Sequence, residues 1–383
     1  MSALRFPFLM SLARAAMFDA IVIGAGPAGS STALLLARAG WTVALVEKSA
    51  FPRRKVCGEF ISTASLPVLE ACGVAKDFLA MAGPVVTRIG LYAGTTMLAS
   101  PREKVWGRAL GREHLDTVLR DAAVRAGAQL FQPADVTSVR RNDSASICTL
   151  QTGADIAAKI VIAACGSWNA KGAFAVPAGP DAPSDLFAFK AHFLGDALPP
   201  GLMPLLAFPG GYGGLVRSDA GRLSLSCCIR RDALAAARER HGGKAAEAVI
   251  AHIRTAAKGV DQVLARAEPD GNFLSTGPIR PGVRPRHQDG MFFVGNIAGE
   301  AHPVIAEGIS MAIQSGALLA RYLAAGRGQA YAAAWNHRFG LRLRAASIFA
   351  HLAMRKPTRA MAGTVIARFP QVLDWGAQLS GKA

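Results

Sequence analysis

Acidic side chains are scarce in this sequence: 26 Asp and Glu accompany 43 Lys and Arg among 383 residues, a formal net charge of +17. Charged residues make up only 18% of the chain and apolar residues 51%, which excludes an intrinsically disordered protein. Aromatic residues make up 7%, and no recognition-helix motif or aromatic-interleaved basic groove is present, so we expect no nucleic-acid partner. The basic excess fits a solvated surface, an acidic carrier protein, an anionic membrane face or a phosphorylated substrate.

Cysteine is sparse and irregularly placed. The six cysteines, at positions 57, 72, 148, 165, 227 and 228, form no even spacing, no Cys-x-x-Cys pair and no cluster with histidine. This pattern argues against a disulfide framework and a zinc site, so no metal is predicted and a reducing cytoplasm is the expected compartment.

Long uncharged runs are also rare. The 18 residues from 20 to 37 carry no charge, but three glycines and a proline among the first ten of them favour a nucleotide-binding turn over a membrane span. Residues 1–16 contain a short apolar run that resembles a signal peptide faintly, and Arg14 interrupts its approach to a cleavage site. We predict that 1–16 is a dispensable extension and that Met17 is the functional start.

The most informative segment begins at residue 18. Apolar runs over 18–24 and 41–46 predict two parallel strands, and 30–38 predicts the helix between them. The first strand and the helix are joined by the glycine turn, whose sequence is Gly24-Ala25-Gly26-Pro27-Ala28-Gly29. In such a turn the first glycine permits the tight bend, the second lets the backbone approach a pyrophosphate and the third lets helix and strand pack closely. The helix N-terminus adds amide donors and a positive dipole end.

Glu47 follows the second predicted strand directly. A carboxylate at this place accepts hydrogen bonds from a ribose 2′-OH and favours an adenosine without a 2′-phosphate. Lys48 is its neighbour and a further candidate for cofactor contact. This segment predicts a dinucleotide site and leaves NAD and FAD open.

The rest of the chain alternates between two kinds of sheet. Buried strands are predicted at 127–131, 159–165 and 291–295, exposed sheet at 85–100, and helices at 65–71, 113–126 and 232–268. Between 187 and 229 the alternation of apolar and polar residues predicts antiparallel strands with one wet face, including a hairpin around 218–221. After residue 295 the chain is mainly helical.

Two further segments bear on the cofactor. Arg112 stands just before a helix expected to pack on the nucleotide domain. The second segment follows the strand that ends on Gly295 and contains Asn296, Pro303, Gly308 and Ile309 before another helix. That helix N-terminus can hold negative charge at a ring edge, as reduced flavin requires. Two such termini about 280 residues apart suit a long cofactor better than NAD.

On these residues the chain resembles the FAD-dependent superfamily that contains the geranylgeranyl reductases and the para-hydroxybenzoate-hydroxylase-like monooxygenases. The resemblance runs from Met17 to about residue 330 and includes the reductase-type loop Phe51-Pro-Arg-Arg-Lys-Val-Cys57-Gly58. Arg112 with Leu115-Asp116 matches the family's helix start, and 295–309 matches its second FAD motif. The resemblance implies FAD as cofactor, bound by Gly24, Gly26, Pro27, Ala28, Gly29, Glu47, Lys48, Arg112, Gly295, Asn296, Pro303, Gly308 and Ile309.

The resemblance also implies an α/β fold: a Rossmann-like, glutathione-reductase-type FAD-binding domain interleaved with an antiparallel-sheet substrate domain and a helical C-terminus. The expected FAD-binding domain comprises 17–80, 102–180 and 275–330. The substrate domain comprises 81–101 and 181–274, and C-terminal helices fill 331–383.

Two departures from the family pattern matter. Asn296 stands where the family has Asp, although an amide can still hydrogen-bond a ribityl hydroxyl. Cys165-Gly166-Ser167-Trp168 stands where the family has an Asp-Gly pair linked to FAD and NADPH binding. This leaves the electron donor open between NADPH or NADH and a separate reductase. The tryptophan pattern of flavin halogenases is missing, which argues against halogenation.

The predicted function is therefore FAD-dependent oxidation or reduction of a hydrophobic small molecule, free or carrier-bound, of polyketide, isoprenoid or aromatic type. Monooxygenation and alkene reduction both remain open, as does a flavin-binding protein with little turnover. Cys57 and His302 are the candidate catalytic residues, each with a structural alternative: a buried thiol and a helix-entry residue.

Three further side-chain assignments follow from the pattern. Glu307 is predicted to cap the following helix rather than line the pocket, and His192 to face solvent opposite Phe187, Phe189 and Phe193. The Arg-rich C-terminal helices are predicted to pack on the nucleotide domain, with docking to a membrane or carrier as the alternative. The expected location is cytoplasmic, with peripheral membrane contact left open.

Overall fold

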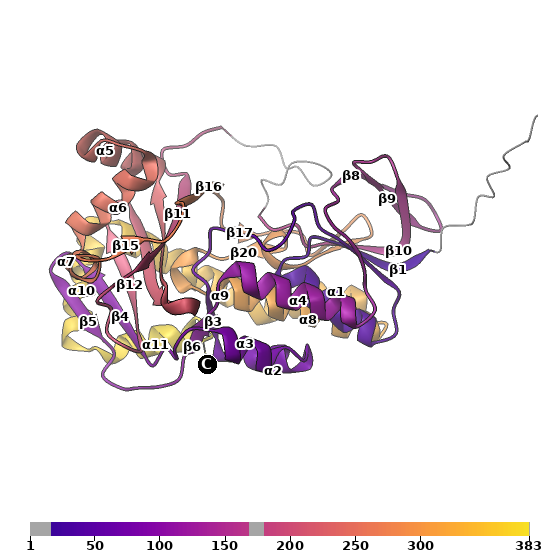
Figure 1. Cartoon of the computed structure of the whole chain (residues 1–383), viewed down its shortest axis with the longest axis horizontal. Coiled ribbons are helices and arrows are strands. Elements are labelled where there is room, and N and C mark those ends of the chain that lie inside the picture. Colours follow the sequence, from indigo (N-terminus) through magenta and orange to yellow (C-terminus); the bar gives the residue numbers. More distant parts are fainter. Residues whose placement is uncertain (1–16, 168–179, 383) are drawn as a thin grey trace, which may run out of the picture.

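The computed structural model describes residues 17–167 and 180–382; the extension 1–16 and Trp168 lie outside this range. Two eight-stranded sheets organise the molecule. Figure 1 shows them side by side, with α1, α4 and α8 lying together beneath the first sheet and α5 and α6 at the far end of the second. The predicted α/β class with parallel and antiparallel sheets and a helical C-terminus is confirmed.

The first sheet has a parallel centre ordered β19-β10-β1-β2-β7. Its strands are β1 Phe18–Ile23, β2 Val43–Val46, β7 Gln129–Phe131, β8 Val136–Arg141, β9 Ser146–Leu150, β10 Asp155–Ala163, β18 His287–Gln288 and β19 Met291–Phe293. The helices on one face are α1 Pro27–Arg38, α4 Arg112–Arg125 and α8 Gly308–Ala324, and the β8–β9 hairpin packs on the other face. The predicted strands and helices of this half all form, and β2 and the C-terminal parts of β1 and β10 are apolar runs covered on both faces of the sheet.

The second sheet is ordered β15-β11-β14-β13-β12-β4-β5, with β16 beside β11. Its strands are β4 Arg88–Ala93, β5 Thr96–Ala99, β11 Leu186–Leu194, β12 Leu202–Phe208, β13 Gly211–Arg217, β14 Leu223–Arg230, β15 Glu268–Pro269 and β16 Leu274–Ile279. All neighbours are antiparallel except β12 and β4, which run parallel. The hairpin predicted around 218–221 joins β13 to β14.

One prediction for this sheet is wrong. Residues 85–100 were expected to form exposed sheet, but five of the six residues of β4 are buried. The cause is cover on both faces: Tyr92 packs with the core under α6 (Ala245–Ala256) and α7 (Lys258–Val263), and Leu91 packs with Leu373 of α11. Alternation along a strand identifies its two faces but not what covers each of them.

The remaining elements connect the two halves. They are β3 Phe60–Ser62, α2 Leu66–Ala71, α3 Ala75–Met81, β6 Gly107–Ala109, α5 Arg231–His241, β17 Gly282–Val283, β20 Gly299–Glu300, α9 Tyr331–Met354, α10 Lys356–Arg368 and α11 Gln371–Leu379. The long helix α9 contacts α8 in the first half and β12 and β13 in the second. The domain boundaries drawn from the sequence stay predictions.

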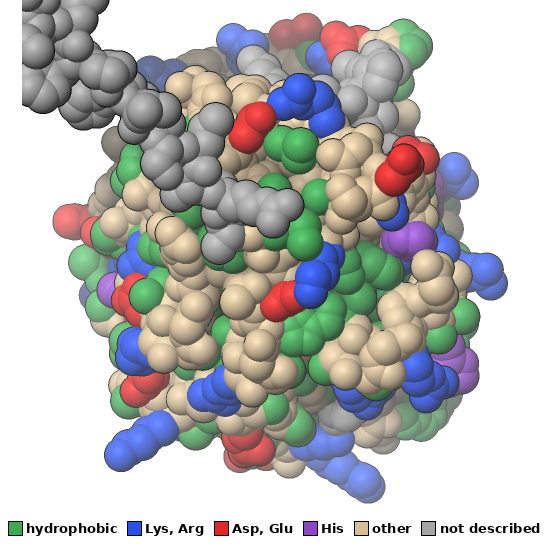
Figure 2. All heavy atoms as spheres, turned by 90° about the vertical axis from the view of Figure 1, so that its right-hand side faces the viewer, with side chains coloured by type: hydrophobic (Ala, Val, Ile, Leu, Met, Phe, Trp, Pro, Cys, Tyr) green, Lys and Arg blue, Asp and Glu red, His purple; other side chains and the backbone are tan. Residues whose placement is uncertain are grey.

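Surface charge is not uniform over the molecule. Figure 2 looks at the end formed by the first sheet, where Lys and Arg side chains lie singly around the rim with Asp and Glu between them. Ion pairs such as Lys159–Asp19 (2.7 Å) and Arg140–Asp155 (3.0 Å) belong to this half. The net excess of basic residues therefore has to be sought elsewhere on the chain.

Candidate functional site

The glycine turn has the geometry that its sequence predicts. Gly24 has φ +104°, and a Cβ there would lie 2.6 Å from the carbonyl oxygen of Ala164 on the neighbouring strand. At Gly29 a Cβ would lie 1.8 Å from the carbonyl oxygen of Gly24. Both positions are closed to any side chain by the protein backbone itself, which is the close helix–strand contact expected of this turn.

Gly26 behaves differently. It immediately precedes α1, and the only atom within 4 Å of a Cβ built there is the Arg112 guanidinium nitrogen at 3.7 Å. The chain would therefore accept a methyl group at this position. The space over Gly26, at a helix N-terminus and beside a guanidinium, is suited to a phosphate group approaching the backbone.

The carboxylate of Glu47 closes the other side of the turn. It is 5% exposed, and it accepts hydrogen bonds from the backbone N–H of Ala25 (2.9 Å) and of Ser49 (2.9 Å). Arg53 lies 3.4 Å from the same carboxylate. Lys48 is exposed on the adjoining loop. Ribose binding by Glu47 and contact by Lys48 stay predictions that this geometry allows.

Arg112 is fixed rigidly. Its guanidinium donates two hydrogen bonds to Asp116, at 2.6 and 2.8 Å, and Arg53 adds a second cation 3.2 Å from that carboxylate. Burial alone would lower the pKa of Arg112, but the carboxylate of Asp116 raises it above its usual value. The Cys57 thiol lies within hydrogen-bonding reach of the same guanidinium. The structure thus brings the predicted residues Gly26, Arg112 and Cys57 together.

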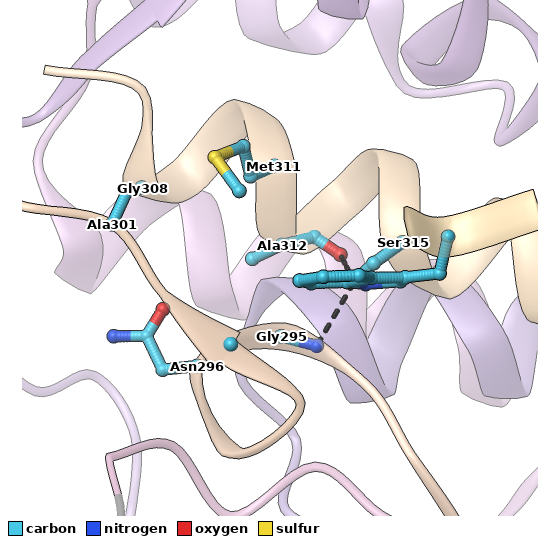
Figure 3. A pocket seen from close by; sticks show the side chains of 9 residues that line it. Gly295, Asn296, Ala301, Gly308, Met311, Ala312 and Ser315 are labelled. Carbon is cyan, nitrogen blue, oxygen red and sulfur yellow. Dashed lines mark hydrogen bonds between the residues drawn. The ribbon is translucent and has the colours of Figure 1, made fainter. Parts of the chain in front are cut away.

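The second predicted motif faces the N-terminus of α8 (Figure 3). Gly295 has φ +69° and donates its N–H to Ser315 of α8 at 2.9 Å. Gly308, at the start of α8, has no atom within 4 Å of a Cβ built on it, so it too borders open space. Ile309 is buried behind it, and Pro303 is exposed on the loop. A small cavity of about 10 Å³ lies between the Gly295 loop and this helix.

Asn296 is oriented by a buried carboxylate that the sequence did not single out. Glu300 accepts hydrogen bonds from the Asn296 amide nitrogen (3.0 Å) and the Ser167 hydroxyl (2.7 Å), and it pairs with Arg284 at 3.2 Å. Burial lowers the pKa of Arg284 to about 10. Asn296 uses its NH₂ group in these contacts, so its carbonyl oxygen can accept from a cofactor hydroxyl.

Cys165 occupies the position of the family's acidic residue at the end of β10. Burial raises the pKa of its thiol to about 11, so the side chain is neutral at physiological pH. It cannot supply the negative charge of the aspartate it replaces.

His302 lies at the junction of the two halves. Its Nδ1 shares a 3.1 Å hydrogen bond with the hydroxyl of Tyr212 on β13, and its ring lies 6.0 Å from that of His351 on α9. Burial, together with His351, lowers the pKa of His302 to about 4, so it is neutral at pH 7. Burial raises the pKa of Tyr212, which therefore keeps its proton. Tyr212 was not predicted; its only sequence signal is a large polar ring between glycines in Gly211-Tyr212-Gly213.

Glu307 does not cap α8, contrary to the prediction. Its buried carboxylate accepts a hydrogen bond from the Ser62 hydroxyl (3.0 Å) and pairs with Lys382 at 3.1 Å, and no side-chain capping bond is made. The same lysine ammonium also donates to the backbone oxygen of Ile305. Lys382 of the C-terminal segment therefore holds the loop before α8.

His192 does not face solvent, and this prediction is also wrong. It is 4% exposed and lies 2.9 Å from Glu59, which also pairs with the buried Lys190. Burial alone would raise the pKa of Glu59, but the hydrogen bond from His192 and the charge of Lys190 hold it at about 2. Phe189 and Phe193 face away, into the core under α6 and α7. The polar face of β11 is covered because it is turned toward the first half of the molecule.

Comparison with known families decides the cofactor. A family model described as "FAD binding domain" matches residues 17–175, which include the glycine turn, Glu47, Arg112 and the end of β10. Residues 17–175 therefore form an FAD-binding domain of this family. FAD is its cofactor, and the resemblance to FAD-dependent enzymes predicted from the sequence is confirmed. Gly26, Gly308 and the helix N-termini described above fit that group, although the contacts of single residues stay predictions.

Relatives of this flavoprotein include the menaquinone reductase of Mycobacterium tuberculosis (strain CDC 1551 / Oshkosh). The two are 30% identical over 156 residues, which are 39% of this chain and 38% of the reductase. The chain spans 38% to 62% of the length of the curated relatives that it matches first. The match therefore supports the cofactor domain and does not extend to whole-protein activity.

Two solved structures share the whole architecture. One is the flavin-dependent brominase Bmp2, with a TM-score of 0.79, 20% identity and coverage of 96% of this chain and 94% of that one. The other is a geranylgeranyl bacteriochlorophyll reductase-like protein from Thermoplasma acidophilum, with a TM-score of 0.71, 18% identity and coverage of 96% and 94%. At these identities the likeness concerns the fold alone.

Proposed function

We propose that this flavoprotein acts on a hydrophobic small molecule and that alkene reduction is the reaction its geometry supports best. FAD supplies hydride or activated oxygen when it is bound. The observation that carries the proposal is the hydrogen-bonded pair of Tyr212 and His302. Hydride addition to an alkene leaves a carbon that needs a proton, and a buried phenol that stays protonated can supply it.

The neighbouring residues provide a route for reloading that proton. His302 is neutral and shares the hydrogen bond of Tyr212, and His351 is exposed to solvent beside it. A proton lost by the phenol could thus be returned by His302, while the ring of His351, 6.0 Å away, leads from His302 toward solvent. The reducing equivalents come from NADPH, NADH or a separate reductase, and the neutral thiol at Cys165 argues for the separate reductase, because the family's aspartate is missing there.

Monooxygenation is the second candidate. The surroundings of Tyr212 favour it, because Leu186, Ala188, Val304 and Ala350 pack around the ring and keep water out. Such exclusion of water would suppress side reactions of the activated oxygen that bound FAD would supply. The substrate in either case is of polyketide, isoprenoid or aromatic type, free or carrier-bound, which would place the protein in secondary metabolism. The net positive charge is compatible with binding of an acidic carrier protein.

Anaerobic photoreduction separates the candidates. The FAD-loaded protein is reduced with light, mixed with an isoprenoid alkene or an aromatic compound, and followed by its visible spectrum. Reoxidation that depends on the alkene without oxygen supports reduction, whereas oxygen uptake coupled to product formation supports monooxygenation. A halide-dependent mass increase would identify halogenation instead. Purified protein that is colourless and binds no FAD would remove the basis of all three.

The role of Tyr212 has its own control. We expect Tyr212→Phe to slow substrate-dependent reoxidation about 100-fold, as for loss of a general acid, with the rate of photoreduction unchanged. Tyr322→Phe, at a partly exposed position near the C-terminal end of α8, is the matched control and leaves both rates unchanged. Equal rates of substrate-dependent reoxidation for the wild type and Tyr212→Phe would argue against alkene reduction and favour monooxygenation or a flavin-binding protein with little turnover.

A further inference from the structure

Large apolar side chains are exposed mainly on the three C-terminal helices. Of sixteen such side chains among the described residues, nine lie within 341–379. They are Leu341, Ile348, Phe349, Leu352, Met361, Val365, Phe369, Trp375 and Leu379. The other seven are spread over residues 17–283. A concentration of this kind on a folded surface marks an interaction site.

The exposed side chains follow helical spacing. On α9, Leu341, Ile348 and Leu352 recur at seven and four residues and are 74%, 62% and 39% exposed, whereas Phe339 and Leu343 face inward. Met361 and Val365 repeat the four-residue spacing on α10, as do Trp375 and Leu379 on α11. Since α10 contacts both α9 and α11, each helix of this group carries an outward apolar stripe.

The same helices carry the basic excess. Residues 331–379, which hold α9, α10 and α11, contain seven Lys and Arg but only one acidic residue, Asp374, so about an eighth of the chain supplies six of the seventeen net positive charges. Arg344, Arg355 and Arg368 are exposed between the apolar side chains. This differs from the end of the molecule in Figure 2, where acidic side chains alternate with basic ones.

We propose that α9–α11 form a docking surface for an anionic lipid membrane. Apolar side chains that include Trp and Phe, interleaved with Arg, bind at the boundary between lipid headgroups and acyl chains. No described helix is long and apolar enough to cross a bilayer, so the contact is with its surface. A second copy of the chain on this face would bring the same arginines against each other.

The surface is connected to the candidate site through α9. Ile348, Phe349 and Leu352 face outward, while Ala350 and Met354 of the same helix pack with Tyr212 and Val304. His351, between them, lies against His302. A hydrophobic substrate dissolved in a membrane would thus reach the pocket along one helix. This route to the candidate site rests on the proposed function. The membrane contact itself does not, because flotation measures it without catalysis.

Vesicle flotation tests the contact. The FAD-loaded protein is mixed with vesicles of phosphatidylcholine alone or with one third phosphatidylglycerol. We expect at least tenfold more protein on the anionic vesicles and a steep loss with added salt. Tryptophan fluorescence should shift to the blue on binding, and Trp375→Phe should reduce the shift more than Trp41→Phe does while the protein still floats, since Trp375 is 61% exposed on this surface and Trp106 and Trp335 are fully buried.

Substitutions distinguish this surface from others. Ile348→Asp and Arg344→Glu/Arg368→Glu should each lower flotation at least tenfold, with the FAD spectrum and photoreduction rate unchanged. Val124→Asp on α4 and Arg240→Glu on α5 are exposed matched controls and should bind as the wild type does. The proposal is overturned if the wild type stays with the soluble fraction, if the controls lose binding equally, or if light scattering shows a dimer that Ile348→Asp dissociates.

Discussion

Replacing Glu59 by Gln should destabilise the protein by about 3–5 kcal/mol at pH 7, the usual loss when one partner of a buried ion pair is removed. The Lys190 side chain is 1% exposed and that of Glu59 is not exposed at all, so solvent cannot compensate for the missing charge. The pKa of Glu59 supports the magnitude. A shift from 4.5 to about 2 corresponds to roughly 3 kcal/mol in favour of the ionised form.

Urea unfolding of FAD-free protein, followed by tryptophan fluorescence, measures this loss. The double variant Glu59→Gln/Lys190→Met should recover most of the stability, because it leaves no unpaired charge. Glu103→Gln is the matched control: its carboxylate is 72% exposed and 4.0 Å from Arg88, so we expect a change below about 0.5 kcal/mol. A Glu59→Gln variant as stable as this control, or a double variant as unstable as the single one, would refute the reasoning.

The pH dependence gives an independent check. The folded-state pKa of Glu59 lies below its ordinary value, so its contribution is fully present above about pH 4.5 and is lost as the pH falls toward 2. The stability difference between wild type and Glu59→Gln should therefore shrink only in this acidic window. A difference that already disappears between pH 7 and 5 would contradict the assignment to Glu59.

Three other predictions concern the cofactor site. Gly26→Ala should weaken FAD binding at least tenfold in a fluorescence titration, while the FAD-free variant stays as stable as the wild type. Gly29→Ala should instead lower the stability of the FAD-free protein by several kcal/mol, because a Cβ at Gly29 meets backbone atoms and a Cβ at Gly26 does not. Arg112→Lys should raise the Kd for FAD about tenfold, because lysine cannot make the two hydrogen bonds that hold Arg112 to the Asp116 carboxylate. An unchanged Kd would show that Arg112 does not contribute to FAD binding. Because the pKa of His302 is lowered in the folded protein, its imidazole is protonated at a higher pH in the unfolded protein, so stability should fall as the pH drops from about 6.5 to 4. Urea unfolding of His302→Gln should lack this part of the acid sensitivity.

The cofactor half could be predicted from local sequence because each of its elements has a local cause. The strand at 18–23 is apolar from residue 20 onward, the turn has glycine where backbone atoms would meet a side chain, and Glu47 follows the next strand. These features are set within 30 residues of one another. The first helix begins at Pro27 rather than residue 30, because proline at the first helical position needs no N–H partner.

The buried polar residues between the two halves could not be found in this way. Tyr212 meets His302 across 90 residues, and Glu59 meets Lys190 across 131. Alternation along β11 separated its apolar face from its polar face correctly, but it could not show that another half of the molecule covers the polar one. A buried lysine and histidine two residues apart on an otherwise apolar strand are the signal that could have indicated this.

The ion pairs of Glu59 also restrict how the enzyme can move. Glu59 belongs to the loop after Phe51 in the first half, while Lys190 and His192 belong to β11 in the second. A hinge opening between the halves would have to separate a carboxylate from two basic groups that no water reaches. We therefore expect the two halves to stay together as one rigid body during catalysis. Exchange of substrate and product would then depend on the C-terminal helices, whose amide hydrogens should exchange with solvent faster than those of β11.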